Sequence, residues 1–236
     1  ETGWSPLSGD QTGSLLGEFL ASRGMRGSLA NSIVSSRLLS RIAHAHGLEH
    51  HTTLTGFKWI ARAPGLGFGY EEAIGFCPDP AHVRDKDGIA TSVVAASLVA
   101  ALKAQGRSVW DELERLARLH GLHVSSPLTF RVEEIEQIAS GMARLRAQPP
   151  SVLAGSPVVE VSDLSQGYRG LPPTDGVLVL TEAGDRVIAR PSGTEPKLKC
   201  YLEVILPVTE GEPLPWEQAH ERLDAIKGAF AEIIGL

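Results

Sequence analysis

Extended apolar runs alternate with helical patterns along residues 8–121, and this alternation most restricts what the chain can fold into. The sequence predicts strands at residues 29–34, 49–55 and 65–70. Helices are predicted around them, starting after the capping-box residues Ser8 and Gln11, near Leu38, near Phe57 and after Ser108. Strands that alternate with helices predict an α/β domain of three layers with a mostly parallel sheet, whose ligands bind at the carboxyl ends of the strands.

A long, mostly apolar segment follows the motif Arg84-Asp85-Lys86-Asp87-Gly88. Residues 89–104 are rich in alanine and valine, a composition typical of a helix buried on a sheet. The motif resembles the start of a calcium loop, but the later ligands and the bidentate glutamate are missing. We therefore expect this motif to cap the helix that follows.

The pattern changes after about residue 122. A strand at 124–132, a helix at 133–147 and a strand at 157–161 precede two hairpin strands and a last helix. The last helix places apolar residues on one face, at alternating spacings of three and four: Trp216, Ala219, Leu223, Ile226, Phe230 and Ile233. We predict a smaller α+β domain with an antiparallel sheet, and domains at residues 1–122 and 123–236.

The composition of the chain argues against nucleic-acid and membrane partners. The formal charge of −6 disfavours a nucleic-acid-binding surface, which needs an excess of lysine and arginine. No apolar run approaches the roughly 20 residues of a membrane helix, and no signal pattern is visible, so we expect a cytoplasmic protein with no membrane partner. Cys77 and Cys200 are too far apart in sequence to indicate a disulfide framework, and we expect small buried side chains in a reducing compartment.

A stiff loop near the C-terminus has the chemistry of an anion site. Arg190 stands at the entrance of the loop, and Ser192, Gly193 and Thr194 follow between two prolines; apolar runs flank the loop, and Lys197 and Lys199 come after it. A cation, two hydroxyls and a glycine that admits main-chain N–H groups suit a phosphate dianion. The alternative is an ordinary hairpin loop rich in proline, glycine and serine.

Glu71 and Glu72 form the second candidate site. Adjacent carboxylates in a glycine-flanked loop cannot both enter a core cheaply, so they face solvent or a ligand. Paired acceptors match vicinal sugar hydroxyls, and Lys58 is a further phosphate or sugar contact. A solvated surface pair is the alternative. The histidines at 44, 46, 50 and 51 lack zinc-site spacing, so no metal site is predicted.

Three motifs in order resemble the α-D-phosphohexomutase superfamily of phosphoglucomutases and phosphomannomutases. They are Thr55-Gly56-Phe57-Lys58, then Gly69 to Gly75 with the Arg84 motif after it, then the Arg190 loop. The resemblance implies the third and fourth domains of four. It implies that Arg190, Ser192, Gly193, Thr194 and Lys199 hold the phosphate that is not transferred, and that Glu71 and Glu72 read the sugar with Gly56, Phe57 and Lys58.

Other parts of the resemblance place Ser35 and Ser36 in the same cleft and Lys58 near the reacting phosphoryl group, where its charge would offset developing negative charge. The motif from Glu71 to Gly75, together with the motif from Thr53 to Lys58 before it, most resembles the branch that includes phosphopentomutase-like enzymes. Ala73 stands where many relatives have serine, which leaves the sugar open.

The family's phosphoserine and its magnesium-binding aspartates have no counterpart in these residues. The resemblance therefore implies that this chain alone is inactive. It also implies that Mg²⁺ and a hexose 1,6-bisphosphate activator serve an intact enzyme, and that the N-terminal half is a partner. The function implied is interconversion of hexose 1-phosphate and 6-phosphate; the alternatives are a phosphopentomutase and a non-catalytic sugar-phosphate binding module.

Overall fold

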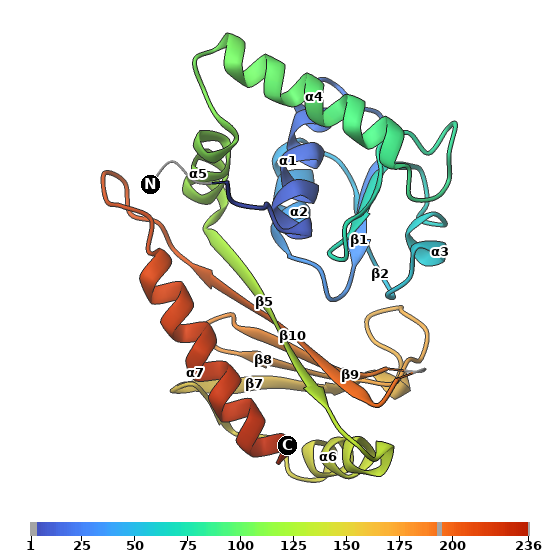
Figure 1. Cartoon of the computed structure of the whole chain (residues 1–236), viewed down its shortest axis with the longest axis vertical. Helices are drawn as coiled ribbons and strands as arrows, with labels where there is room; N and C mark the ends of the chain where they lie inside the picture. The colour runs from blue at the N-terminus through green and yellow to red at the C-terminus, as the bar shows by residue number, and fades with distance from the viewer. Residues whose placement is uncertain (1–3, 193–194, 236) are drawn as a thin grey trace. The chain divides into compact units, whose positions relative to one another are not determined.

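The chain forms two compact units, one up to His120 and one from Gly121 onwards. The computed structural model describes residues 4–192 and 195–235. Each unit has its own sheet and its own helices, drawn in Figure 1. A mixed, mostly parallel sheet in the first unit and an antiparallel sheet in the second confirm the predicted fold class.

The sheet of the first unit has the strand order β2-β1-β3-β4. Strands β1 and β2 and strands β1 and β3 pair in parallel, whereas β3 and β4 form an antiparallel hairpin. The carboxyl ends of β1, β2 and β3 therefore lie along one edge. The strand bounds are β1 Ser28–Ser32, β2 His50–Thr53, β3 Leu66–Glu71 and β4 Gly75–Cys77.

Helices cover both faces of this sheet (Figure 1). On one face, leucines of α1 and α2 pack with Leu29, Phe68 and Tyr70, and on the other α3 packs with Ala30 and Leu66. The alternation of Leu29 and Ala30 between the two clusters follows from the two-residue repeat of a strand. The helix bounds are α1 Gly9–Ser22, α2 Leu38–Ala45, α3 Phe57–Ile60, α4 Gly88–Ala104 and α5 Val109–His120.

The helix ends agree with the capping patterns in the sequence. Ser8 and Gln11 form the predicted capping box at the start of α1, with reciprocal bonds of 2.9 and 3.1 Å. Asp87 Oδ1 accepts from the main-chain N–H groups of residues 89 and 90, each at 3.0 Å. The expectation that the Arg84 motif caps α4 is confirmed.

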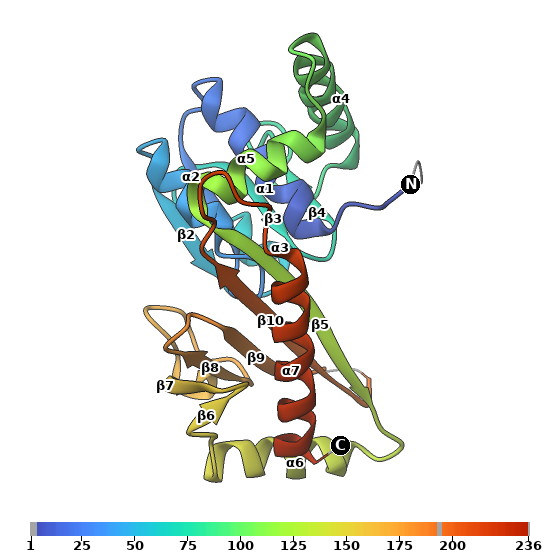
Figure 2. The same cartoon turned by 90° about the vertical axis from the view of Figure 1, so that its left-hand side faces the viewer.

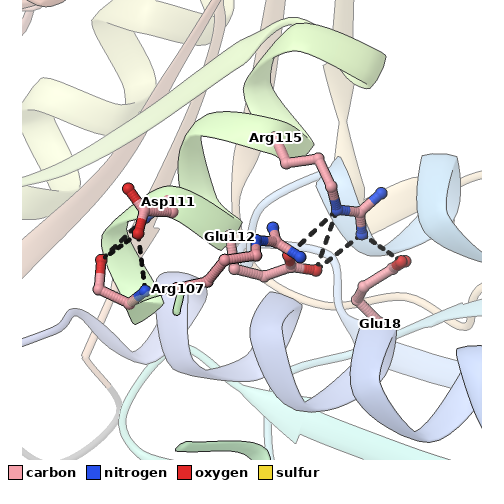
Figure 3. A network of polar contacts seen from close by, with 6 residues as sticks. Glu18, Arg107, Asp111, Glu112 and Arg115 are labelled. Atoms are coloured by element: carbon pink, nitrogen blue, oxygen red, sulfur yellow. Dashed lines mark hydrogen bonds and ion pairs between the residues drawn. The ribbon is translucent and has the colours of Figure 1, made fainter. Parts of the chain in front are cut away.

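Charged groups join α1 to α5 (Figure 3). The Arg115 guanidinium donates to Glu112 at 2.7 Å and also pairs with Glu18 on α1. Arg107 pairs with Glu112 as well. The hydrogen bonds that Arg115 donates to Glu112 and Glu18 raise the pKa of Arg115. Burial acts to raise the pKa of Glu112, but Arg115 and Arg107 outweigh it and lower that pKa. Each charge in this network, the buried Glu18 and Glu112 and the half-buried Arg107 and Arg115, therefore has an opposite charge beside it.

The prediction that the alanine- and valine-rich helix is buried on the sheet is wrong. Among the residues of α4, three are buried: Thr91, Leu98 and Leu102. The helix contacts α1, α5 and β4 and lies at the margin of its unit (Figure 1, Figure 2). An apolar composition favours packing of a helix against some other surface, but it does not identify that surface.

The second unit is a six-stranded antiparallel sheet with two helices on it. The strand order is β5-β10-β9-β8-β7-β6, and the hairpin of β9 and β10 carries the Arg190 loop at its tip. The bounds are β5 Leu122–Arg131, β6 Val152–Leu153, β7 Ser156–Asp163, β8 Val177–Thr181, β9 Arg186–Pro191, β10 Lys197–Leu206, α6 Ile135–Ala147 and α7 Trp216–Ile234, with a short 3₁₀ helix η1 Leu164–Gln166.

Helix α7 runs along the sheet against β10 and β5 (Figure 2). Its buried side includes Leu223, Ile226 and Phe230, as the helical period predicts. The buried stripe ends on Ile234, whereas Ile233 is only half-buried and Trp216 is exposed. The sequence pattern therefore identified the face but not the residues at its two ends.

Both cysteines are buried thiols, as expected. Desolvation raises the pKa of Cys77 to about 11 and that of Cys200 to about 12, so both are protonated near neutral pH. Neither is an activated nucleophile.

In the described part of the chain, none of the helices is by itself both long and apolar enough to cross a membrane. Helices α4 and α5 meet that test only together, as a pair bent by 87°.

Candidate functional site

The carboxylate pair lies at the carboxyl ends of the parallel strands. Glu71 is the last residue of β3, and Glu72 opens the turn to β4. Both side chains are half-buried. Their position matches the strand edge at which open α/β sheets bind ligands.

Two serines fix Glu72. The hydroxyls of Ser32 and Ser35 each lie 3.0 Å from Glu72 Oε2, and they lie 2.8 Å from each other. The main-chain N–H of Glu72 donates to Ser35 Oγ at 3.2 Å. Ser32 ends β1 and Ser35 lies in the loop that follows. One carboxylate oxygen is therefore held by buried hydroxyls.

The start of α1 supports the same loop. Asp10 Oδ1 accepts from the main-chain N–H of Ser36 at 2.7 Å and from the Tyr70 hydroxyl at 3.0 Å. A Cβ added to Gly9 would lie 2.0 Å from the main-chain oxygen of Glu72, so only glycine allows this approach. The loop after β1, the end of β3 and the first turn of α1 thus form one hydrogen-bonded cluster.

Glu71 faces a cation that the sequence associated only with helix capping. Its side chain and that of Lys86 meet over Gly75, where an added Cβ would lie 2.7 Å from Glu71 Cγ and 2.8 Å from Lys86 Cδ. Lys86 Nζ also lies 5.0 Å from the centre of the Phe57 ring, and Phe57 is buried. The face of the Phe57 ring therefore stabilises the Lys86 ammonium group by a cation–π contact.

Burial raises the pKa of Glu71, mainly because it removes the carboxylate from water. Lys86 opposes that rise, while the charges of Glu72 and Asp85 add to it. A carboxylate in this setting gains by accepting hydrogen bonds from a ligand.

Gly56 and Lys58 lie at the start of α3, the helix that precedes β3 and its Glu71 in the sequence. Gly56 has a φ of 106°, which glycine adopts readily, and it is the N-cap of α3. Lys58 is exposed, with its Nζ 5.7 Å from the Trp59 ring centre. Among the residues that the structure describes, Lys58 makes no hydrogen bond or ion pair with Glu71 or Glu72.

The second unit gathers four cations on one face of its sheet. Arg190 on β9 lies directly opposite Lys199 on β10, and Lys197 on β10 lies directly opposite Arg131 on β5. Lys197 and Lys199 are two residues apart, so both side chains project from the same face. We call Arg131, Arg190, Lys197 and Lys199 the cation strip.

Like charges directly opposite each other weaken an antiparallel pair. Glu195 partly neutralises the cation strip, with an oxygen 2.7 Å from Lys197 Nζ, and this contact lowers the pKa of Glu195. A hollow of about 210 Å³ adjoins three of these cations and is lined by Arg190, Pro191, Ser192, Lys197, Lys199 and Tyr201. A small anion would complete the charge balance there.

The structure gathers the candidate residues into two groups, one in each unit. Ser192 lines the hollow, whereas the predicted contacts Gly193 and Thr194 lie outside the described residues. Sequence reasoning missed Lys86, Arg131 and Tyr201 as neighbours of these groups. The alternation of β10 could have pointed to Tyr201, but only strand pairing brings Arg131 to the strip.

Two family models match the chain. Residues 8–119 match "Phosphoglucomutase/phosphomannomutase, alpha/beta/alpha domain III", and residues 129–205 match the C-terminal domain of the same family. The chain belongs to the phosphoglucomutase/phosphomannomutase family and carries the domains of its C-terminal half.

The relatives are phosphomutases. A Haemophilus influenzae protein named "Probable phosphomannomutase" is 42% identical over 85% of this chain and 41% of its own length. The phosphopentomutase of Mus musculus is 29% identical over 97% of this chain and 42% of its own length. The chain thus spans less than half the length of these curated relatives.

A solved structure has the same fold. The phosphoglucomutase pp63/parafusin from Paramecium superposes with a TM-score of 0.69 at 18% identity, over 98% of this chain and 43% of that one.

Proposed function

We propose that this chain is the sugar-recognising and phosphate-anchoring part of a phosphohexomutase. The intact enzyme would interconvert hexose 1-phosphate and 6-phosphate through a bisphosphorylated sugar. The single observation that carries the proposal is the opposition of Arg190 and Lys199 across β9 and β10, around a hollow sized for a small anion. The match of this unit to the C-terminal domain of the phosphoglucomutase/phosphomannomutase family supports a phosphate as that anion.

Each unit would hold one part of the ligand. The cation strip would hold the phosphate that is not transferred, through charge-assisted hydrogen bonds from Arg190 and Lys199 and the hydroxyl of Ser192. Gly193 and Thr194 belong to the same proposed anchor. Glu71 and Glu72 would accept hydrogen bonds from sugar hydroxyls, and Lys58 and Lys86 would lie near phosphoryl charge.

A phosphate anchor suits this chemistry for a physical reason. The bisphosphorylated intermediate has to turn between two half-reactions, so a grip that accepts a phosphate from either end of the sugar keeps the intermediate bound while it turns. The N-terminal half of the enzyme would supply the phosphoserine and the Mg²⁺ site. Within the described ranges no three metal-ligating side chains converge, so we assign no metal step to these residues.

Calorimetry on this chain with inorganic phosphate and with glucose 1,6-bisphosphate tests the proposal. We expect binding that is weak, because only half of the cleft is present, and that competes between the two ligands. Tight binding of the bisphosphate would favour the alternative of a self-sufficient sugar-phosphate binding module. No binding of either ligand would contradict the anchor.

The phosphopentomutase alternative has specific support in the match to the mouse enzyme over 97% of the chain. Rates of the intact enzyme on ribose and hexose phosphates separate the two. A preference for ribose phosphates would replace the hexose assignment without changing the site.

We expect Glu71→Gln to raise the stability of the first unit at pH 7 while weakening sugar-phosphate binding. The folded-state pKa of Glu71 lies above its ordinary value of 4.5. The free energy of unfolding therefore falls as the pH rises from the unfolded-state pKa to the higher folded-state pKa, and it stays lower above that range. Glutamine removes that loss. Thermal unfolding of wild type and variant should therefore differ at pH 7 and converge below about pH 4, with equal curves at both pH values contradicting this account.

A further inference from the structure

Helix α4 has an apolar face that none of the described residues of its own unit covers. Residues 88–102 carry no charged side chain. Ile89 is 84% exposed, Val93 63% and Val99 49%, and Ala96 and Ala100 are exposed as well. We call these five residues the outer α4 face.

The outer α4 face is continuous. Positions 89, 93, 96 and 100 are spaced by four, three and four residues, so they lie along one side of the helix, and Val99 lies beside them. The stripe is about 17 Å long at 1.5 Å per residue. Single exposed apolar residues are common on protein surfaces, but a continuous stripe marks a contact surface.

The core contacts of α4 are made by the other side of the helix, so they do not bury the outer α4 face. Leu98 and Leu102 already join the core with α1 and α5. The outer α4 face is thus a second apolar side on the same helix. By contrast, α5 and α7 place charged residues toward water, among them Glu114, Arg118, Glu221 and Asp224. A helix without such a polar side is normally buried on all sides.

We infer that the polypeptide preceding domain III in the family packs on the outer α4 face in the intact enzyme. The inference rests on the proposed function, because it requires that longer enzyme. The matched model is described as a third domain, and more than half of each curated relative lies outside the matched region. Small side chains at 96 and 100 admit a close-packed apolar neighbour.

Area and charge favour this occupant over two others. A stable dimer buries about 800 Å² per partner, which the five side chains of the outer α4 face do not supply. A domain of the same polypeptide needs less buried area for stable contact, because the covalent link already holds the two surfaces at high effective concentration. Helices that lie on membranes pair an apolar face with a lysine- and arginine-rich one, whereas Lys103 is the only basic residue of α4.

Thiol labelling tests the inference without needing activity. Cys77 and Cys200 are buried, so a cysteine introduced by Val93→Cys or Ala96→Cys becomes the reactive one. We expect maleimide to label either variant at least tenfold more slowly in the intact enzyme than in this chain alone. Leu119→Cys, on α5 and 61% exposed at present, is the matched control and should label alike in both.

The other outcomes overturn the inference. Equal labelling of Val93→Cys in both proteins would show that the face stays open. Protection of the isolated chain that grows with protein concentration would assign the face to a second copy, and protection by added phosphatidylglycerol vesicles would assign it to a membrane. Failure of the proposed function appears separately, as absent phosphate binding by this chain.

Discussion

Replacing Arg190 with alanine should weaken the binding of inorganic phosphate to this chain by about 10- to 150-fold. The range corresponds to the loss of one charge-assisted hydrogen bond, about 1.5–3 kcal/mol. In the proposed intact enzyme the same change should raise KM strongly, because the proposed anchor would hold the substrate in every state that precedes release. Calorimetry on the chain and steady-state kinetics on the enzyme measure the two effects.

The same substitution should leave the unliganded chain as stable as wild type or slightly more stable. Arg190 and Lys199 are like charges directly opposite each other, an arrangement that costs about 0.2–1 kcal/mol. Removing one charge relieves that repulsion. A loss of affinity together with unchanged or higher stability would therefore separate a binding residue from a structural one.

Two controls sharpen the Arg190 test. Arg190→Lys keeps the charge but loses the planar fork that binds phosphate through two hydrogen bonds, so it should fall between wild type and alanine. Arg169→Ala removes an exposed arginine of the same unit, paired with Glu160 at 2.9 Å and outside the hollow, and should not change phosphate affinity. Unchanged affinity in Arg190→Ala would refute the anchor.

We expect Asp185→Ala to destabilise the second unit by about 3 kcal/mol. The Asp185 carboxylate is fully buried in the turn between β8 and β9, where it accepts three contacts of 2.7–2.9 Å from Arg222 on α7 and one of 3.1 Å from the Thr181 hydroxyl. Removing it leaves a largely buried guanidinium without its partner. The lower end of the usual 3–5 kcal/mol applies because Arg222 keeps some contact with water.

Thermal unfolding of the second unit measures this loss, and we expect its Tm to fall by about 10 °C. Asp224→Ala is the matched control, since Asp224 also pairs with a cation on α7, Lys227 at 2.9 Å, but is exposed. An exposed pair of this kind contributes about 0.3–0.5 kcal/mol. Similar losses in both variants would show that the buried pair does not pin α7 to the sheet.

The double variant Asp185→Leu with Arg222→Met isolates the cause. Apolar replacement of both members of a buried ion pair is often neutral or stabilising, because neither charge then needs to be desolvated. It should recover much of the stability that Asp185→Ala loses. No recovery would assign the loss to the shape of the turn.

Local features of the fold were readable in advance. The capping box at the start of α1, the hairpin tip at Arg190 and the apolar stripe of α7 each depend on residues within a few positions of one another, so the sequence pattern carries their whole physical cause. The same holds for the family assignment, which rests on short motifs in order.

The candidate site was readable only in part. Strand β4 and the loop after it separate Glu71 and Glu72 from Lys86 in the sequence. The contact between Glu71 and Lys86 over Gly75 depends on how β4 pairs with β3 and how that loop folds back. Arg131 joins the cation strip because β5 pairs with β10, across more than 60 residues of chain. Strand order is a long-range property, so neither neighbour could be assigned from spacing.

The sequence by itself determined the two fold classes, the helix ends and the chemistry of the two candidate groups, because propensity, capping and turn formation are local interactions. Only the tertiary structure decided which cations share a sheet face, which hydroxyls hold Glu72, and that the apolar helix α4 faces outward. The physical reason is that register and burial arise between segments that are distant in the chain, and composition alone cannot say which surfaces meet.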